Sequence, residues 1–435
     1  MMSPLSLHSF PRAILHVDGD SFFASCEVAK NPALKGKCVV TGKERGIASS
    51  MTYEAKARGV TRAMRLSEIK RLIPDVIILP SDYETYSLYS QRMYEIVRRY
   101  TADIEEYSID ECFADLTGMR RPNNMAYEAM ADKVKHDLDS ELGMTFSVGL
   151  SVNKVLAKAA SKWKKPSGLT IIPGYNIHLY LQKLLVGKVW GIGANTSAYL
   201  NKMGIQTAYD LAIKDVDWVK KNLSKPFQEI HAELNGKFVY PLILGEKHDY
   251  ASVSKTRTFT PPTDKEEYIF AQLSKNLENA CIKIRRHNLF TKRFAFFLKT
   301  QSFSYSGLEL KLSQKVSVPQ EILTLIRSHW KEVYIPNVLY RASGVVLMDL
   351  DHDSTETIDL FGKTSIIDRV SKIYEAVDKV SLKYGKHSLF LGSSFHAMNN
   401  ASHTGSRGEA SLRSTNLLKG ETRRKRIGIP FLGEV

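Results

Sequence analysis

Residues 13–20 read Ala-Ile-Leu-His-Val-Asp-Gly-Asp, a short apolar run that stops at Asp18-Gly19-Asp20. Such a run predicts a buried strand that ends where the carboxylates begin. Residues 104–117 predict two more short strands, one on each side of Asp110-Glu111. If these strands are neighbours in one sheet, Asp18, Asp110 and Glu111 converge at its edge.

Outward from this segment, strands and helices alternate around one predicted sheet to about residue 172. Residues 146–150 alternate as a strand, and the apolar positions of residues 152–163 have helical spacing. Residues 173–240 carry short helical segments, and residues 241–251 are the expected linker to a second region.

The second region has a different order of elements, β-α-β-β-α-β, which is typical of a ferredoxin-like unit. The chain of 435 residues is therefore predicted to be an α+β multidomain protein, with about three domains as the prior from its length. The expected elements are a strand at 252–259, a helix at 265–288, strands at 290–299 and 303–313, a helix at 318–332 and a strand at 338–349.

The composition points to a polyanionic partner. Lys and Arg number 61 against 46 Asp and Glu, which gives a formal charge of +15 and a pI near 9.4. Such an excess favours nucleic acid over an anionic membrane surface. No apolar run approaches the roughly 20 residues of a membrane span, and no signal-peptide segment precedes Pro11. The four scattered cysteines fit a reducing compartment, so we expect a cytoplasmic protein without membrane contact.

Residues 101–115 contain six carboxylates and no Lys or Arg, a local reversal in a basic chain. Hard oxygen ligands suit Mg²⁺, and bound cations would neutralise carboxylates that otherwise repel one another. A solvated acidic hairpin with an Asx turn at Asp18 is the alternative, and spacing alone favours it. The six residues are Asp103, Glu105, Glu106, Asp110, Glu111 and Asp115.

Residues 151–172 hold five lysines and no acid. The apolar stripe of the predicted helix leaves Lys154, Lys158 and Lys162 on its far side, where a solvated face is the ordinary interpretation. The helix ends in Lys164-Lys165-Pro166-Ser167-Gly168, a cationic turn suited to phosphate. Tyr53-Glu54-Ala55-Lys56-Ala57-Arg58-Gly59 adds a hydroxyl and two cations, so the acidic and basic groups together predict a nucleoside-triphosphate site.

Two segments surround the candidate carboxylates. Residues 16–27 read His-Val-Asp-Gly-Asp-Ser-Phe-Phe-Ala-Ser-Cys-Glu, and residues 107–113 read Tyr-Ser-Ile-Asp-Glu-Cys-Phe. They resemble the first motif and the second carboxylate motif of the Y-family DNA polymerases. Residues 147–151, Asn153-Lys154 and residues 165–169 match the stretch that follows. The resemblance extends over about residues 13–350. The chain resembles both the bacterial polymerase IV branch and the UmuC branch of the family.

The resemblance implies the right-hand fold of a polymerase, with a ferredoxin-like β-α-β-β-α-β little finger. The C-terminal extension is expected to carry a helix and, from about residue 393, a flexible basic tail. The implied boundaries are palm 1–29 and 81–172, fingers 30–80, thumb 173–240, linker 241–251, little finger 252–350 and extension 351–435.

The resemblance also assigns the chemistry. It implies that Asp18, Asp110 and Glu111 are the catalytic residues and that they ligate two Mg²⁺ ions, with the Gly19 carbonyl as a further metal ligand. Asp20, although adjacent, is expected to be structural. The implied substrates are primer–template DNA and dNTPs.

Five residues are expected to contact the nucleotide. Phe23 falls at the steric-gate position, where a ring would clash with a 2′-hydroxyl, although an ordinary core aromatic is the alternative. Tyr53 and Lys165 would contact the triphosphate. The family commonly has Arg where this chain has Lys56, which replaces a bidentate fork by a point charge, and Arg58 is expected to share that role.

Two regions are expected to bind the DNA backbone. Gly191-Ile192-Gly193, followed by helical sequence, resembles a helix-hairpin-helix whose glycines let backbone N–H groups reach a phosphate, whereas GxG alone is merely a turn. The little-finger-like unit contains a run of basic residues with no acidic residue among them. These residues would bind the phosphates of duplex DNA independently of its base sequence. The candidates there are Arg285, Arg286, Lys292 and Arg293.

Residues 357–361, Thr-Ile-Asp-Leu-Phe, resemble the short clamp-binding peptide of bacterial polymerases. Leu360 and Phe361 would anchor in a pocket of a sliding clamp, although the usual leading Gln is absent. The basic run at residues 423–426 would add non-specific attraction to DNA, with a solvated tail as the alternative.

The sequence therefore predicts a monomeric, template-directed DNA polymerase of the low-fidelity translesion type, without proofreading. Two alternatives remain open at this point. The three carboxylates also suit a metal-dependent nuclease or a nucleotide cyclase, and the basic regions suit a DNA-binding module without catalysis.

Overall fold

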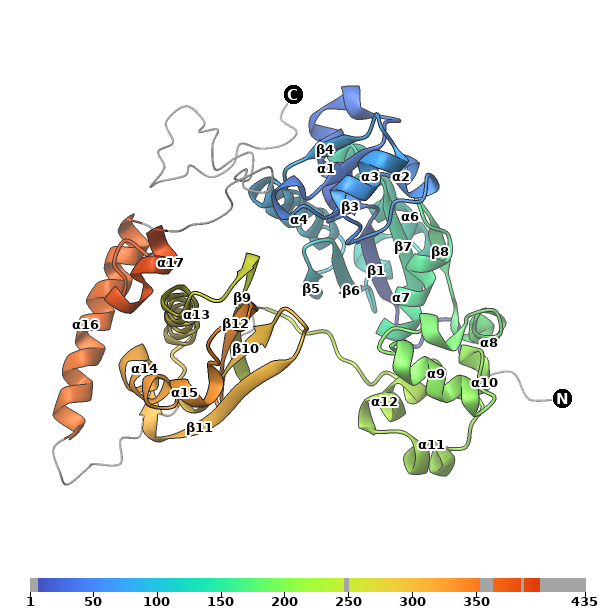
Figure 1. Cartoon of the computed structure of the whole chain (residues 1–435). Coiled ribbons are helices and arrows are strands. Elements are labelled where there is room, and N and C mark those ends of the chain that lie inside the picture. The colour runs from blue at the N-terminus through green and yellow to red at the C-terminus, as the bar shows by residue number, and fades with distance from the viewer. Residues whose placement is uncertain (1–6, 246–249, 353–362, 385–386, 400–435) are drawn as a thin grey trace. The chain divides into compact units, whose positions relative to one another are not determined.

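The computed structural model describes residues 7–245, 250–352, 363–384 and 387–399. These residues divide between two compact units, one that ends at Gly245 and one that follows it along the chain (Figure 1). Both units combine a sheet with helices, so the predicted α+β content is confirmed. None of the described helices is long and apolar enough to cross a membrane.

The first unit is built on a five-stranded sheet with the order β5-β6-β1-β7-β8. The central strand β1 is antiparallel to both neighbours, β6 and β7. The strand that carries Asp18 lies beside a strand that begins at Glu111, so the condition for their convergence is met. The strands are β1 (Ile14–Gly19), β5 (Ile104–Ser108), β6 (Glu111–Asp115), β7 (Phe146–Ser151) and β8 (Leu169–Ile171).

Alternation along these strands sends side chains into two layers of helices. Leu15 and Val17 enter the core formed with α4 and α6, whereas Ile14 packs with Ala157 of α7 on the opposite face. Helix α7 approaches the sheet closely because Gly149 has no side chain; a Cβ there would lie 2.2 Å from the Ala157 carbonyl oxygen. The helices are α1 (Phe22–Lys30), α4 (Tyr83–Arg98), α5 (Arg120–Asn123), α6 (Tyr127–Leu142) and α7 (Lys154–Trp163).

A small three-stranded sheet, with the order β3-β2-β4, lies in the chain between α1 and α4 and has its own core. The Ser50 hydroxyl ties this sheet to α1, since it donates to the Ser21 carbonyl at 3.0 Å and accepts from the Ala24 N–H at 3.4 Å. The small sheet is thereby held beside the end of β1. Its elements are β2 (Val39–Thr41), β3 (Ser50–Met51), α2 (Tyr53–Ala57), α3 (Leu66–Leu72) and β4 (Ile77–Leu79).

Five short helices complete the first unit, and they share a core with the apolar stripe of α7. The Glu233 carboxylate accepts hydrogen bonds from the N–H groups of Val155 (3.3 Å), Val239 (2.7 Å) and Tyr240 (2.9 Å). These bonds join the last short helix to the first turn of α7. The helices are α8 (Ile177–Leu181), α9 (Ala194–Lys202), α10 (Ala208–Ala212), α11 (Val216–Asn222) and α12 (Lys225–Leu234).

The second unit has the predicted β-α-β-β-α-β order of elements. Its sheet is antiparallel with the order β11-β10-β12-β9, so each helical connection skips one strand. Phe294, Phe296 and Leu298 of β10 form its core with α13 and α14. The elements are β9 (Ser252–Thr263), α13 (Glu266–Arg286), β10 (Thr291–Thr300), β11 (Tyr305–Val316), α14 (Pro319–Ser328), α15 (Trp330–Val333) and β12 (Tyr340–Met348).

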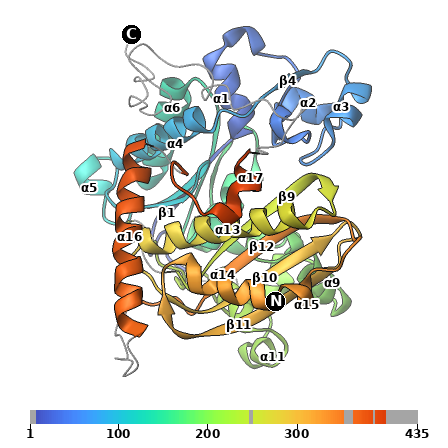
Figure 2. The ribbon, with the colours of Figure 1, turned by 60° about the vertical axis from the view of Figure 1, so that its left-hand side comes forward.

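Helices α16 (Lys363–Tyr384) and α17 (Phe395–Asn399) pack beside α13 (Figure 2). Ser394 is buried, and its hydroxyl bonds with Ser274 at 2.9 Å and with the Glu278 carboxylate. The expectation of a flexible segment from residue 393 is therefore wrong for residues 393–399. Polar composition suggested exposure there, but the serines are satisfied by polar groups on α13.

Candidate active site at the edge of the five-stranded sheet

The three predicted carboxylates lie on two paired strands and the turn beside them. Asp18 and Glu111 are direct partners across β1 and β6, and the Gly19 N–H donates to the Asp110 carbonyl at 2.8 Å. The Asp110 carboxylate accepts a hydrogen bond from Ser108 Oγ at 2.6 Å. The structure thus brings Asp18 and Glu111 together, while the Asp110 side chain is engaged by Ser108. Over the described ranges, no three acidic, His or Cys side chains are grouped closely enough to hold one metal ion.

Each of the two paired carboxylates has a lysine partner. Lys165 forms an ion pair with Asp18 and lies 3.6 Å from Asp20 Oδ1, and Lys158 Nζ lies 2.5 Å from Glu111 Oε2. Burial raises the pKa of Asp18 to about 6; Glu111 adds to the rise and Lys165 opposes it. The site therefore concentrates negative charge that ammonium groups offset, as divalent cations also can.

The expectation that Lys154 and Lys158 lie on a solvated helix face is wrong. Both side chains are buried, with Lys154 Nζ 2.5 Å from Glu105 Oε2 and Lys158 on Glu111. Helix α7 is covered on two sides, because its apolar stripe packs on the five short helices while its lysines lie over β5 and β6. Of the three lysines, Lys162 is exposed as predicted.

Asp20 is fully buried and organises the cationic turn, in keeping with the structural role expected for it. Its carboxylate accepts hydrogen bonds from Ser147 Oγ (2.8 Å), Thr145 Oγ1 (3.1 Å) and the Ser167 N–H (2.6 Å). The turn that carries Lys165 is therefore tied to the strand edge that carries Asp18.

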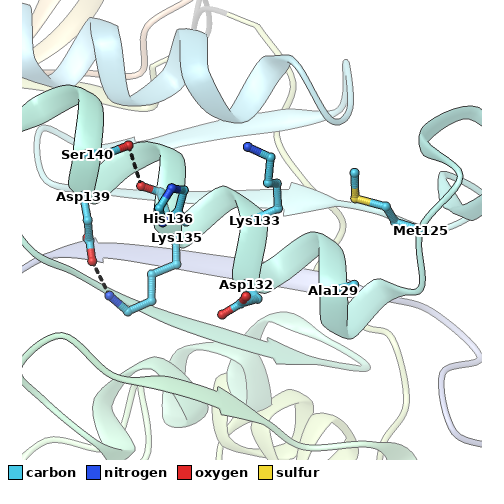
Figure 3. A pocket seen from close by; sticks show the side chains of 8 residues that line it. All are labelled: Met125, Ala129, Asp132, Lys133, Lys135, His136, Asp139 and Ser140. Atoms are coloured by element: carbon cyan, nitrogen blue, oxygen red, sulfur yellow. Dashed lines mark hydrogen bonds and ion pairs between the residues drawn. The ribbon is translucent and has the colours of Figure 1, made fainter.

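Lys135 gives this turn a second support that the sequence analysis missed. Its Nζ donates to Ser167 Oγ at 3.0 Å and pairs with Asp139, whose other oxygen accepts from the Phe146 N–H at 2.8 Å. The only sequence signal was the i, i+4 spacing of Lys135 and Asp139. Figure 3 shows Lys135 turned toward Asp139 in a surface hollow lined by Met125, Ala129, Asp132, Lys133, Lys135, His136, Asp139 and Ser140.

Two of the predicted triphosphate contacts lie on α2, beside Asp20. The Tyr53 hydroxyl is 3.5 Å from Asp20 Oδ1, and Lys56 Nζ donates to Ser21 Oγ at 2.8 Å and lies 4.1 Å from the centre of the Tyr53 ring. Burial lowers the pKa of Lys56, and the nearby Lys165 lowers it further. Arg58 is not brought to this place, because it pairs with Asp75 at 3.4 Å on the exposed surface.

Phe23 is half-buried in the first turn of α1, the helix that follows the strand of Asp18. Its ring stacks on Tyr86 with centroids 4.5 Å apart and meets the edge of Tyr83 at 5.5 Å. The Tyr86 hydroxyl in turn donates to Glu27 Oε1 at 2.6 Å. Helix α4 therefore fixes the Phe23 ring from one side.

His16 is a buried neighbour of the carboxylates to which the sequence analysis gave no role. Its Nδ1 lies 2.7 Å from Ser161 Oγ, and its Nε2 lies 4.0 Å from Glu111 Oε2 without a hydrogen-bond partner. Burial lowers the pKa of His16 well below its usual value, and the surrounding lysines add to this effect. His16 is thus a neutral ring beside Glu111.

The expected DNA contacts in the first unit lie at the start of α9. Gly191 has a φ of +90°, a conformation that favours glycine, and Gly193 directly precedes the helix. Both glycines are exposed. The first turn of α9 therefore presents backbone N–H groups at the surface, as phosphate binding requires.

The expected DNA contacts in the second unit differ in their surroundings. Arg286 and Lys292 are exposed. Arg293 instead pairs with Glu309 (2.6 Å) and Asp349 (2.8 Å), and Arg285 pairs with Asp378 of α16 at 2.7 Å. The clamp-binding candidates Leu360 and Phe361 lie outside the described residues, as does the basic run at 423–426.

Comparisons with known proteins agree with this architecture. Residues 17–162 match the impB/mucB/samB family, and residues 251–360 match the impB/mucB/samB family C-terminal domain. The chain is 33% identical over 343 residues to DNA polymerase IV of Lactococcus lactis subsp. cremoris (strain MG1363), which covers 77% of this chain and 93% of that protein. It is 30% identical over 382 residues to DNA polymerase IV 1 of Bacillus subtilis (strain 168), with 86% and 91% covered.

Solved structures share the fold. A Y-family DNA polymerase chimera of Dbh and Dpo4 matches with a TM-score of 0.66 at 24% identity, over 78% of this chain and 100% of that one. An insertion ternary complex of Dbh DNA polymerase matches with a TM-score of 0.52, also at 24% identity and with the same coverage.

The five-stranded sheet of the first unit and the β-α-β-β-α-β sheet of the second give the chain the fold of solved Y-family polymerases. The chain belongs to the impB/mucB/samB family, the Y-family DNA polymerases, as its motifs predicted. It is a DNA-directed DNA polymerase of the translesion class, which acts with DNA and nucleotides and depends on a divalent metal.

Proposed function

We propose that this polymerase adds dNTPs to a primer 3′-hydroxyl with low fidelity, using two Mg²⁺ ions and no proofreading. The observation that carries the proposal is the direct pairing of Asp18 with Glu111 at a sheet edge faced by Lys165. Two carboxylates that could bind metal, Asp18 and Glu111, and a lysine that could bind phosphate, Lys165, therefore lie in one cluster. A nuclease could share the carboxylates, but Tyr53 and Lys56 beside Asp20 favour a nucleoside triphosphate.

The donor set fits Mg²⁺. The Asp18, Asp110 and Glu111 carboxylates and the Gly19 carbonyl are hard oxygen ligands of the kind that Mg²⁺ prefers. Burial raises the pKa of Asp18 although Lys165 opposes the rise, so a divalent cation would further stabilise the carboxylate there. When bound, the two ions would lower the pKa of the primer hydroxyl and stabilise the pyrophosphate that leaves.

The remaining side chains bind and orient the substrate. Lys165 and Lys56 supply positive charge for the triphosphate, and the Tyr53 hydroxyl donates a hydrogen bond to it. Asp20 and Lys135 hold the Lys165 turn in place. The Phe23 ring, backed by Tyr86, would exclude a 2′-hydroxyl. Arg58 would reach the triphosphate only after leaving Asp75.

The domain assignment follows from the same proposal. The five-stranded sheet is the palm (1–29 and 81–172), the small sheet is the fingers (30–80) and the short helices are the thumb (173–240). The linker is 241–251, the second sheet is the little finger (252–350) and the extension is 351–435. Exposed Gly191 and Gly193 in the thumb, and exposed cations such as Arg286 and Lys292 in the little finger, would contact duplex backbone.

Primer extension on a primed template with Mg²⁺ and dNTPs tests the function. Elongation supports a polymerase, shortening of the primer supports a nuclease, and a mobility shift without either supports a binding module. Asp110→Ala should lower the incorporation rate at least about 10²-fold, because stabilisation of the transferring phosphoryl group is lost. Primer–template binding should persist, since basic residues elsewhere supply that affinity. Near-normal extension by this variant would contradict the two-metal assignment.

We also propose that Leu360 and Phe361 bind a bacterial sliding clamp and that the protein works as a cytoplasmic monomer. The support is the Leu-Phe pair in a polar segment that directly follows the little finger, and four buried free cysteines that suit a reducing compartment. Clamp stimulation of primer extension should be present in wild type and lost in Leu360→Ala/Phe361→Ala. Equal stimulation in both would rule the segment out.

A further inference from the structure

Trp190 lies where the thumb hairpin meets the palm. Its backbone directly precedes Gly191, but its ring packs among palm aromatics. The centroid of the ring is 5.8 Å from that of Phe113 and 5.6 Å from that of Tyr107, which it meets at 89°. Trp190 is therefore shared between the surface expected to hold duplex DNA and the strand that begins at Glu111.

Lys158 stands between this ring and Glu111. Its Nζ lies 5.4 Å from the centre of the Trp190 ring, 4.3 Å from that of Tyr107 and 2.5 Å from Glu111 Oε2. The Lys158 side chain is 5% exposed, so water replaces little of this contact. Cation–π contacts strengthen when the cation is desolvated, which makes the two rings a real constraint on where the ammonium sits.

The hairpin and the Trp190 ring are joined through one tight turn. The Ile192 N–H donates to the Val189 carbonyl at 3.1 Å, and this closes a tight turn around Trp190 and Gly191. The Trp190 ring is also held from the other side by Tyr240, with centroids 6.0 Å apart. A phosphate that fixes the N–H groups after Gly191 therefore also fixes the position of the ring.

We propose that Trp190 is a positioning residue that couples duplex binding at the Gly191–Gly193 hairpin to the orientation of Glu111 through Lys158. The proposal rests on the polymerase function proposed above and adds a control of its active site by the bound duplex. When DNA holds the hairpin, the Trp190 ring holds the Lys158 ammonium, and Lys158 holds the Glu111 carboxylate in one orientation.

The kinetic test compares Trp190→Leu with Trp190→Phe in single-turnover incorporation at saturating DNA and dNTP. Trp190→Leu keeps apolar bulk but loses the ring face, so the rate should fall about tenfold and the Mg²⁺ concentration for half-maximal rate should rise. Trp190→Phe keeps a ring face and should restore most of the rate. The dissociation constant for primer–template should be unchanged in both.

Trp218→Leu is the matched control. Trp218 also belongs to the thumb and also lies beside a lysine, Lys214, whose Nζ is 5.2 Å from the ring centre. The Trp218→Leu variant should keep the incorporation rate and the Mg²⁺ dependence of wild type. In a double-mutant cycle, Trp190→Leu should add little to Lys158→Met, because both remove the same link. Fully additive effects would contradict the proposed route.

A second readout needs neither metal nor catalysis. Addition of a DNA duplex in EDTA should change the tryptophan fluorescence of wild type and of Trp218→Phe, but not that of Trp190→Phe. An equal change in all three would show that the Trp190 ring does not respond to DNA. If Trp190→Leu fails to fold, Trp190→Met offers a flexible side chain without a ring face and takes its place.

The outcomes separate the two proposals. If wild type does not extend a primer, the polymerase function fails. If wild type extends normally and Trp190→Leu matches it in rate and Mg²⁺ dependence, the function stands and the coupling is overturned.

Discussion

Lys154 and Glu105 form a buried ion pair, with 2.5 Å between Nζ and Oε2 and with 4% and 7% of the side chains exposed. The same carboxylate oxygen accepts the Ile243 N–H at 3.0 Å, and Lys154 Nζ lies 4.8 Å from the centre of the Phe113 ring. One carboxylate thus joins α7, β5 and the segment through which the chain leaves the first unit.

Lys154→Met should lower the free energy of unfolding by about 3–5 kcal/mol, because it leaves the Glu105 charge buried without a counter-charge. The double variant Lys154→Met/Glu105→Gln should recover part of this loss, since the uncompensated charge is gone. Urea unfolding of the three proteins measures both effects. Lys133→Met, which removes the exposed pair with Asp137, is the control and should cost less than about 1 kcal/mol. Equal losses at the two sites would contradict the prediction.

Asp18→Asn should stabilise the metal-free protein above pH 6. Burial raises the pKa of Asp18 from 3.8 to about 6, so between these values the folded protein binds the proton more tightly than the unfolded chain. Wild type therefore loses stability from Asp18 as the pH rises from about 4 to about 6, and Asn avoids that loss. The gain in EDTA should be near zero at pH 4 and about 1–3 kcal/mol at pH 7.5, measured by urea unfolding.

Asp137→Asn is the control of opposite sign. Burial alone would raise the pKa of Asp137, but hydrogen bonds from Lys133 and Tyr100 outweigh it and lower that pKa. The Asp137 carboxylate therefore stabilises the fold above its unfolded pKa, and its loss should destabilise the protein increasingly as the pH rises. A gain for Asp18→Asn that is independent of pH would show that the pKa of Asp18 is not raised.

The strands that carry Asp18 and Glu111 were predictable from an apolar run that ends in Asp18 and from two short strands around Asp110-Glu111. Spacing alone favoured a solvated acidic hairpin, so the convergence of these carboxylates was favoured only by the resemblance of the motifs. The buried lysines of α7 escaped prediction, because helical periodicity locates an apolar stripe but not a second covered face. The Arg285–Asp378 pair escaped as well, since its members lie 93 residues apart and no local pattern relates them.

Phe23→Ala should increase ribonucleotide insertion relative to deoxynucleotide insertion. Removing the ring opens the space beside the nucleotide sugar, and discrimination should fall by at least about tenfold, the effect of losing one steric contact in the transition state. Single-nucleotide insertion with matched rNTP and dNTP gives the ratio.

Phe22→Leu is the neighbouring control, because Phe22 is a buried member of the palm core, whereas Phe23 is half-buried and only packs against that core. It should lower stability and leave sugar discrimination intact. If Phe23→Ala behaves in the same way, the Phe23 ring serves packing against Tyr86 alone.

Arg286→Ala/Lys292→Ala should weaken duplex binding and reduce its salt dependence by about one unit of slope for each DNA phosphate that is no longer neutralised. Arg285→Ala should keep the slope, because Asp378 and the Ser317 carbonyl already occupy this guanidinium. It should instead lower stability by loosening α16 from α13. Fluorescence titrations at several salt concentrations distinguish the Arg286/Lys292 pair from Arg285. A full loss of slope in Arg285→Ala would mean that the ion pair opens for DNA.

The docking of α16 on α13 removes one cation from the charge that the second unit offers to solvent. The Arg285 guanidinium is enclosed by Asp378 of α16, by the Ser317 carbonyl and by the Tyr374 ring, whose centre lies 4.7 Å away. A helix that follows the β-α-β-β-α-β unit along the chain thus decides which cations of that unit stay available to a polyanion.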